Sequence, residues 1–197
     1  MGVIAAVAFA WVVRPWYMRW GASDAEVAAA LPGDEYVPSP RTLTTKAVTI
    51  QASPEQIFPW LVQMGADKGG WYSHASIEGL LNCPIVNADR LHPEWQTVSV
   101  GDPVKMCPGE FGPPPYTVVA FEKDHFMIWG HLEADGAWND VYQFVLQPAG
   151  NGETRLVFRS RSNSVGLIWD VLEPGFFIME SGMLQGIKQR VEAAPQT

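Results

Sequence analysis

The chain has 197 residues, of which 47% are apolar and 17% charged, and its formal net charge is −8. This length is sufficient for one domain with a substantial core. The acidic balance disfavours the basic surface that nucleic-acid binding requires, so no nucleic acid is expected as a partner. Nine tryptophans and nine phenylalanines indicate large aromatic surfaces, either in a core or around a cavity.

The first 21 residues form an apolar N-terminal segment. Residues 3–13 (VIAAVAFAWVV) are uninterrupted apolar sequence, and Arg14, Arg19 and several aromatic residues follow. The run is shorter than the about 20 residues of a spanning helix, and it lacks the basic start of a signal peptide. Aromatic residues beside arginines are typical of a membrane interface, and basic residues favour the cytoplasmic side. We therefore predict a membrane anchor over residues 1–21, with the domain in the cytoplasm; the alternative is an apolar helix packed on the domain.

Residues 22–41 are predicted to be a tether between this anchor and a domain that covers residues 42–194. Ser23 and the acidic residues after it are typical of the first turn of a short helix. Pro38 and Pro40 favour extended chain beyond that helix.

The domain begins with a predicted strand and two predicted helices. Residues 42–51 (TLTTKAVTIQ) are rich in β-branched residues, which favours a strand. Ser53-Pro54-Glu55 supplies an N-cap, a first-turn proline and a first-turn acid for a helix. Gly65 ends this helix, and residues 74–81 predict a second, shorter one.

The rest of the domain is predicted to be an antiparallel meander closed by one helix. Strands are expected over residues 116–122, 126–132, 138–146 and 154–161, because turn-forming residues separate these β-rich stretches. Apolar residues then recur at helical spacing from Phe176 to Val191, which predicts a helix from about residue 173 to 193. Its apolar stripe must pack on the meander, the only predicted surface large enough to cover it.

The order of these elements and three local stretches resemble the START-like, or SRPBCC, superfamily. The stretches are Ser53–Leu61 (SPEQIFPWL), Gly69–Ser73 (GGWYS) and Thr154–Arg159 (TRLVFR). Polyketide cyclase/dehydrase-like proteins and lipid-transfer domains belong to this superfamily. The resemblance implies an α+β helix-grip fold, in which a curved antiparallel sheet wraps around a long C-terminal helix and short helices follow the first strand. It also implies a cavity between sheet and helix, but no reaction. The Gly-Trp-Tyr sequence, Asn87–Arg90 and Arg14–Gly21 look like a bacterial subgroup with a membrane segment.

Candidate cavity residues cluster first between Gly65 and Arg90. A Gly-Gly bend lets the backbone turn sharply, and the Trp-Tyr pair after it offers apolar surface with hydrogen-bonding tips. Asp89 is either an acid/base group or a loop cap. The complete predicted lining is Trp71, Tyr72, His74, Asp89, Trp129, His131, Trp138, Tyr142, Met179 and Met183.

Alternation along the strands gives further expectations. Trp138, Asp140 and Tyr142 share one face of a strand, which should face inward and place Asp140 near the cavity mouth. Arg159 and Arg161 alternate with apolar residues, so both are predicted on the outer surface.

No cofactor and no metal are expected. The four histidines never lie at ligand spacing from one another. Cys83 and Cys107 have neither CxxC nor Cys/His spacing and are predicted to be buried, free thiols that stay reduced.

Three functions fit this pattern. The first is binding or carrying an apolar small molecule, such as a lipid-, isoprenoid- or polyketide-like compound, at a membrane. The second is an enzyme of the cyclase, dehydratase or isomerase type in the same cavity. The third is a membrane-tethered interaction module with a filled core. We favour the first, because no convergent acid/base or nucleophile motif is present.

Overall fold

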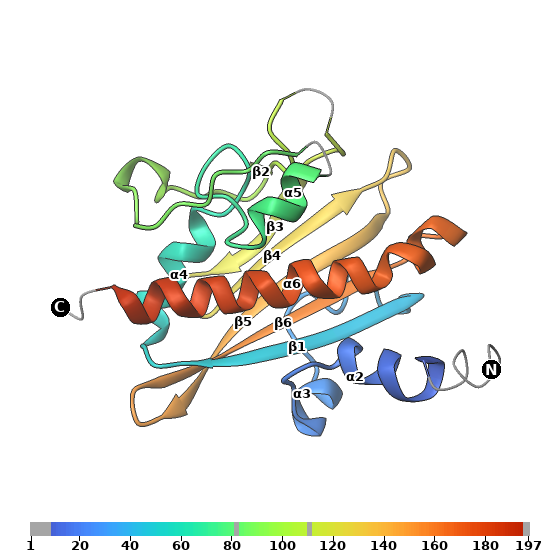
Figure 1. Ribbon diagram of the computed structural model, residues 1–197, viewed down its shortest axis with the longest axis horizontal. Helices are drawn as coiled ribbons and strands as arrows, with labels where there is room; N and C mark the ends of the chain where they lie inside the picture. Colours follow the sequence, from blue (N-terminus) through green and yellow to red (C-terminus); the bar gives the residue numbers. More distant parts are fainter. Residues whose placement is uncertain (1–8, 81–82, 110–111, 195–197) are drawn as a thin grey trace.

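A curved antiparallel sheet and one long helix organise the structure, a computed structural model that describes residues 9–80, 83–109 and 112–194. The six strands are β1 (Thr42–Ile50), β2 (Pro103–Val104), β3 (Tyr116–Glu122), β4 (Phe126–Leu132), β5 (Trp138–Gly150) and β6 (Glu153–Ser162). They pair in the order β1-β6-β5-β4-β3-β2, and every pairing is antiparallel. Helix α6 (Leu167–Ala193) runs across one face of this sheet (Figure 1). The predicted helix-grip α+β fold is confirmed.

Helix α6 is longer than the sequence pattern predicts. It begins at Leu167 and continues through Pro174, whereas its start was predicted at about residue 173. A proline inside a helix removes one backbone hydrogen bond and bends the axis, and Figure 1 shows α6 changing direction near this end. The helix therefore covers more of the sheet than the apolar stripe alone indicates.

Three short helical segments lie between β1 and β2: α4 (Pro54–Val62), α5 (Ala75–Leu80) and η2 (Pro93–Trp95). At the start of α4 the Ser53 amide donates to the side chain of Gln56, at 3.0 Å, which satisfies one of the free amides at a helix N-terminus. The main core lies between α4, α6 and the inner sheet face; fully buried members include Ile57, Leu156, Phe158, Leu184 and Ile187.

The segment before β1 covers the outer face of the sheet. After η1 (Phe9–Val13) and α2 (Arg14–Met18), α3 (Asp24–Ala28) is capped by Ser23, which accepts from the Glu26 amide at 3.2 Å. Leu31 is buried against outer-face residues of β1, β5 and β6, so the stretch expected to be a tether packs on the sheet.

This covering changes the environment of the two outer-face arginines, which were predicted to be on the surface. Arg159 is only 2% exposed and Arg161 only 8%. Both guanidinium groups donate to Asp34, at 2.9 and 3.0 Å, and to backbone carbonyls of the covering segment. Strand alternation placed them on the correct face, but it contains no information about what covers that face.

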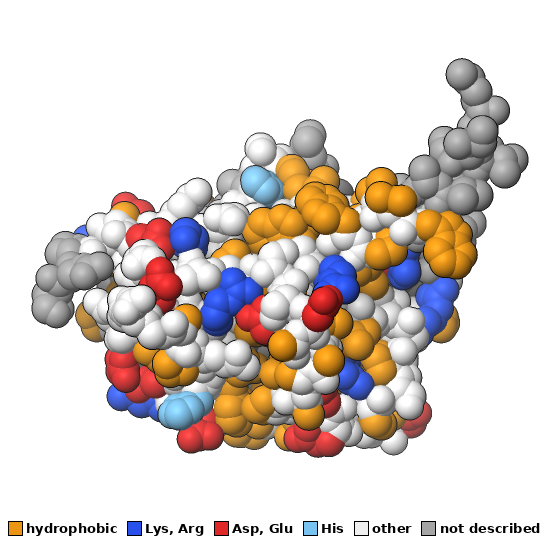
Figure 2. Space-filling model, turned by 90° about the horizontal axis from the view of Figure 1, so that it is seen from below, with side chains coloured by type: hydrophobic (Ala, Val, Ile, Leu, Met, Phe, Trp, Pro, Cys, Tyr) orange, Lys and Arg blue, Asp and Glu red, His pale blue; other side chains and the backbone are white. Residues whose placement is uncertain are grey.

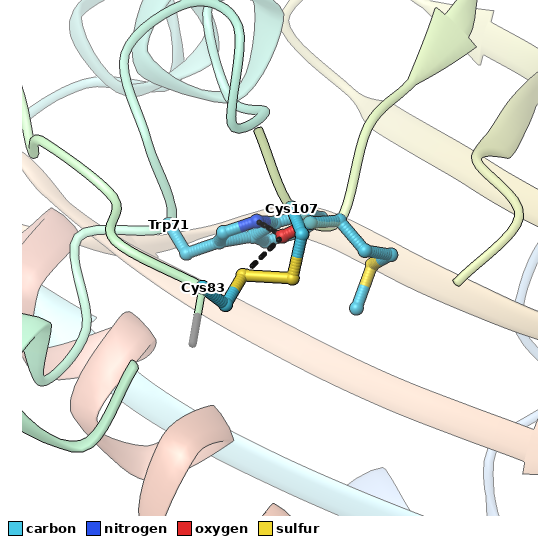
Figure 3. The surroundings of a disulfide bond; sticks show 4 residues. Trp71, Cys83 and Cys107 are labelled. Carbon is cyan, nitrogen blue, oxygen red and sulfur yellow. Dashed lines mark hydrogen bonds between the residues drawn. A yellow bond between two sulfur atoms is a disulfide. The ribbon is translucent and has the colours of Figure 1, made fainter. Parts of the chain in front are cut away.

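The prediction of free thiols is wrong. Cys83 and Cys107 form a disulfide whose Cα atoms are 5.2 Å apart (Figure 3). The indole N–H of Trp71 donates to the carbonyl oxygen of Met106 at 3.1 Å, and the Cys83 sulfur lies 3.5 Å from the same oxygen. The disulfide thus ties the loop after α5 to the loop after β2, and spacing alone could not identify such a pair.

Among the residues that the structure describes, no helix combines the length and the apolar character needed to cross a bilayer. Residues 1–8 of the predicted anchor lie outside the described residues.

Candidate ligand-binding site

A cavity of about 560 Å³ lies between the inner face of the sheet and the N-terminal half of α6. Thr44, Ser160 and Tyr142 form one row across β1, β6 and β5, since Thr44 pairs with Ser160 and Ser160 with Tyr142. All three line the cavity. Phe176 and Phe177 of α6 line it as well. The cavity therefore has the place that the resemblance implies, but it occupies only one end of the groove under the helix.

A buried ion pair crosses the cavity from sheet to helix. Lys46 of β1 donates to Glu180 of α6 at 2.5 Å, and their side chains are 1% and 11% exposed. A buried pair of this kind is costly to desolvate and costlier to break. The pair joins the sheet to helix α6 at the boundary between the packed core and the cavity.

Asp140 of β5 is the second buried carboxylate in the lining. Its Oδ1 atom accepts hydrogen bonds from the hydroxyls of Ser162 and Ser164, at 3.0 and 3.1 Å. Its Oδ2 atom lies 3.7 Å from Nδ1 of His131. Burial raises the pKa of Asp140, and the two hydroxyls and His131 offset this only in part. The carboxylate is thus poorly compensated for its burial.

Two tyrosines lie beside Asp140. The rings of Tyr116 and Tyr142 are stacked with centroids 4.9 Å apart, and both residues line the cavity. Burial raises the pKa of both phenols, and the negative charges of Asp140 and Glu180 raise it further. Both hydroxyls are therefore neutral hydrogen-bonding groups at physiological pH.

One polar atom of the lining has no partner. The Thr44 hydroxyl oxygen is buried and makes no hydrogen bond with any described residue, although Thr44 lines the cavity. Buried polar atoms are nearly always paired. An orphan hydroxyl in a cavity wall is therefore a position at which a bound molecule can gain a hydrogen bond.

The rim of the cavity includes the N-terminal segment. Arg14 of α2 donates to both carboxylate oxygens of Glu173 in α6, at 2.8 and 2.7 Å, and the Tyr17 hydroxyl donates to the same carboxylate. The pKa of Tyr17 is raised by burial and by its bond to Glu173. Trp16 packs edge-on against Phe177 with centroids 5.5 Å apart. The segment predicted to reach the membrane is thus also part of the cavity entrance.

The structure brings only two of the predicted lining residues to this cavity, His131 and Tyr142. Trp71, Trp129 and Met183 belong to the close-packed core. In Figure 3 the Trp71 side chain lies beside the disulfide.

Three further predicted residues pack between the loop after α4 and helix α6. Tyr72 and His74 lie in a shallow groove along the other side of α6, and the Met179 carbonyl accepts from the Ser73 hydroxyl at 3.0 Å. Asp89 is exposed.

Trp138 does not face the cavity. It packs on the outer face of the sheet with Tyr36 and Val37. The pairing of β4 with β5 shifts between His131–Asp140 and Leu132–Trp138, which leaves Asn139 as an extra residue. A β-bulge of this kind reverses the alternation beyond it, so Trp138 and Asp140 lie on opposite faces.

The sequence pattern did not identify several other lining residues. They include Thr44, Lys46, Tyr116, Glu173, Phe177 and Glu180. The polar residues among them interrupt apolar patterns: Lys46 lies in a strand otherwise buried at its centre, and Glu180 lies within the apolar stripe of α6. That interruption is the signal that was available. Within the described residues, no group of three or more His, Cys, Asp or Glu side chains is placed to hold a metal ion.

Several solved structures are similar to this chain. The Aha1 dimer from Colwellia psychrerythraea is 18% identical, with 78% of this chain and 98% of that chain covered and a TM-score of 0.49. A protein from Arthrobacter aurescens is 12% identical, with 86% and 94% covered and a TM-score of 0.49. Truncated norcoclaurine synthase from Thalictrum flavum is 15% identical, with 77% and 94% covered and a TM-score of 0.45. At these identities and TM-scores, none of them carries information about a ligand or a reaction.

No family model and no curated protein matches the sequence. The architecture itself, a curved antiparallel sheet around a long C-terminal helix, is the helix-grip arrangement. Membership of the START-like superfamily, and of its narrower membrane-anchored subgroup, stays a prediction.

Proposed function

We propose that the protein binds or carries a small molecule with an apolar body in the cavity between sheet and α6. The observation that carries this proposal is the cavity of about 560 Å³ itself, because close-packed interiors contain few voids larger than a water molecule. Aromatic walls from Tyr116, Tyr142 and Phe177 suit an apolar body, and the unpaired Thr44 hydroxyl suits a polar group on it. Lipid-, isoprenoid- and polyketide-like compounds have this composition.

The test fills the cavity from its floor. Ser160→Leu adds apolar volume at the centre of the Thr44–Ser160–Tyr142 row, whereas Ser160→Ala removes the hydroxyl and adds none. With a solvatochromic apolar dye as the probe, we expect Ser160→Leu to weaken binding at least about tenfold and Ser160→Ala to retain it. Circular dichroism verifies that both variants are folded. If the wild type binds no dye, the interaction module with a filled core takes the place of this proposal.

We further propose that the N-terminal segment holds the protein at a lipid membrane. Trp11 is 79% exposed, Val12 67% and Trp16 56%, and Figure 2 shows hydrophobic side chains gathered next to the N-terminal end of the molecule. Exposed aromatic residues of this kind are typical of membrane interfaces. Trp11 and Val12 belong to the apolar run of residues 3–13, Trp16 follows it, and the three residues lie next to the cavity entrance. A ligand dissolved in the bilayer would therefore have a short path to the site.

Flotation with phosphatidylcholine–phosphatidylglycerol vesicles tests this proposal. The double substitution Trp11→Ser/Trp16→Ser should release the full chain from the vesicles. Val86→Ser removes an equally exposed apolar side chain elsewhere, since Val86 is 85% exposed, and should not. Wild-type protein that stays in the soluble fraction with residues 1–21 intact contradicts the membrane proposal.

The side of the membrane is a separate matter. The arginines after the apolar run favour the cytoplasm, whereas the Cys83–Cys107 disulfide favours an oxidising compartment. Thiol labelling in intact cells decides between them, because reduced cysteines in a cytoplasmic domain would be modified only after the membrane is permeabilised.

An enzyme is the second candidate function, and one observation favours it. Nδ1 of His131 lies 3.7 Å from Asp140 in the cavity wall, so a small side-chain movement would form the carboxylate–imidazole hydrogen bond that orients a general acid–base catalyst. A reaction of the cyclase, dehydratase or isomerase type would need such a group. Conversion of a bound ligand by the wild type, lost in His131→Gln while binding persists, would establish this function.

A further inference from the structure

The charged groups of the cavity are unequally paired. Lys46 is paired with Glu180 at 2.5 Å, and Glu173 is paired with Arg14 at 2.7 Å. Within the part of the chain that the structure describes, Asp140 has no lysine or arginine partner, although the residue is only 8% exposed. Of the three buried or half-buried carboxylates, one is therefore left without a permanent positive charge.

The uncompensated part of Asp140 is a single oxygen atom. Its Oδ1 accepts hydrogen bonds from Ser162 and Ser164, at 3.0 and 3.1 Å. No described residue donates a hydrogen bond to its Oδ2, and the His131 imidazole lies 3.7 Å from this atom. An ionised carboxylate removed from water is costly unless it is both paired and hydrogen-bonded. Asp140 thus has a free acceptor position in the wall of a cavity.

The neighbours of Asp140 suit a positive charge. The stacked rings of Tyr116 and Tyr142 lie close enough for the Asp140 charge to raise the pKa of both phenols. Aromatic faces attract cations, most strongly where water is excluded. Carboxylate and aromatic faces together form a site for an N–H-bearing cation.

We infer that the cavity recognises an organic ammonium ion: an amine with an apolar body, whose charged nitrogen lies at Asp140 and whose body lies against Phe176 and Phe177. This inference rests on the proposed function and names the chemical class of its ligand.

An anionic ligand, such as a fatty acid, fits less well. The Lys46 ammonium is already bonded to Glu180, and Arg41 donates to the carbonyl oxygen of Ser164. A ligand carboxylate would also meet Glu133 and Asp140, which line the same cavity. Like charges at close range disfavour binding, so the lining selects against anions.

Three probes with one chain length test the inference: octylamine, 1-octanol and octanoate, measured by calorimetry with the full chain at neutral pH. A charge-assisted hydrogen bond in a dry site is worth enough to favour the amine over the alcohol about 10- to 100-fold. Asp140→Asn should remove this preference and leave the affinity for 1-octanol unchanged. Asp135→Asn removes the same charge from an exposed turn and should leave the preference intact.

Each remaining result is informative. Equal binding of all three probes, or an amine preference that survives in Asp140→Asn, overturns the ammonium site and leaves the proposed function standing. Tighter binding of octanoate overturns it in favour of Lys46 as the recognition group. If no probe binds the wild type, the proposed function itself fails and the ammonium site fails with it.

Discussion

Asp140 is a residue at which binding and stability make opposite demands. Its pKa is raised by burial, so the native state binds protons more readily than the unfolded chain does. The stabilising contribution of its protonated form is complete below pH 3.8 and is lost as the pH rises through the folded-state pKa. At neutral pH the ionised group is therefore destabilising, as expected for a site prepared for a cationic partner.

We predict that Asp140→Asn increases the free energy of unfolding at pH 7 by on the order of 1 kcal/mol. The asparagine oxygen can still accept from Ser162 and Ser164, so the strand end should keep its local structure. Urea denaturation at pH 7 and pH 4 measures the effect, and the gain should shrink at the lower pH. Asp135→Asn, at an exposed turn carboxylate outside the cavity, is the control. A loss of stability at pH 7 would contradict the sign of this argument.

Of the individual residues that line the cavity, the sequence predicted only some. His131 and Tyr142 were found because strand alternation is local. Trp138 was misplaced because the extra residue at Asn139 reverses that alternation, and no turn residue announces the bulge. Lys46 was missed because a lysine within a strand usually reaches solvent. Its burial depends on Glu180, which lies 134 positions away.

Helix α6 meets the loop after α4 through glycine. A side chain at Gly186 would overlap the carbonyl oxygen of Tyr72, and one at Gly182 would meet the His74 ring at 2.7 Å. Tyr72 itself has a φ of 56°, which is unusual for a residue other than glycine. The Asn87 side chain accepts from its backbone amide at 2.6 Å. The Gly-Trp-Tyr stretch therefore shapes the contact with α6 instead of lining the cavity.

We predict that Gly186→Ala destabilises the protein by roughly 1–3 kcal/mol, because the helix must move away from the loop. Gly175→Ala is the matched control within the same helix, since nothing lies within 4 Å of a Cβ at that position. Alanine favours helix over glycine, so this control should be neutral or stabilise by about 0.5–1 kcal/mol. Thermal unfolding of both variants measures the difference. Equal effects would show that the close approach is not what limits this position.

Elements with a clear period were predicted well. The bounds of β3 and β4 match the expected strands, and the apolar stripe from Phe176 to Val191 lies within α6. Contacts between segments that are far apart in the sequence could not be predicted from periodicity. The burial of Arg159 and Arg161 depends on residues 22–38, which show no strong hydrophobic periodicity. These residues contact the two arginines through backbone carbonyls, which every residue type has, so no side-chain pattern reveals the contact.

Asp34 joins the covering segment, residues 22–41, to the outer face of the sheet. Burial alone would raise the pKa of this carboxyl, but hydrogen bonds from Gln143 and the Leu31 amide and the charges of Arg159 and Arg161 hold it below its ordinary value. A lowered folded-state pKa contributes stability that is present above pH 3.8 and lost as the pH falls through the folded-state value. Acid should therefore loosen the covering segment.

We predict that Asp34→Asn lowers the free energy of unfolding at pH 7 by roughly 3 kcal/mol, because two buried guanidinium groups lose their counter-ion. The difference from the wild type should narrow as the pH falls below 3.8 and through the lower folded-state pKa, because the wild-type carboxyl is then itself protonated. Chemical denaturation between pH 7 and pH 3 follows both. Glu35→Gln is the neighbouring control and should change stability little. A difference independent of pH would contradict the role of the Asp34 charge.

The disulfide acts on the whole molecule through the unfolded chain. Cys83 and Cys107 close a loop with a sequence separation of 24, so their loss should cost about 3 kcal/mol of stability. We predict this loss for Cys83→Ser/Cys107→Ser, and a similar loss for the wild type under reducing conditions. Met106 lies next to Cys107 and lines the cavity, so it should move more freely once the disulfide is lost. Ligand binding should weaken as a result. Reductant that leaves the variant unaffected but destabilises the wild type identifies the disulfide as the cause.

The contact of Arg14 and Tyr17 with Glu173 has a consequence for the order of events during synthesis. These partners are 159 and 156 positions apart, so Arg14 and Tyr17 cannot make this contact until Glu173 has been synthesised. Proteins leave the ribosome N-terminus first, and a contact of such long range forms late. The sheet is then already assembled while the entrance of the cavity is still open. Synthesis of α6 and closure of the entrance are therefore expected to coincide.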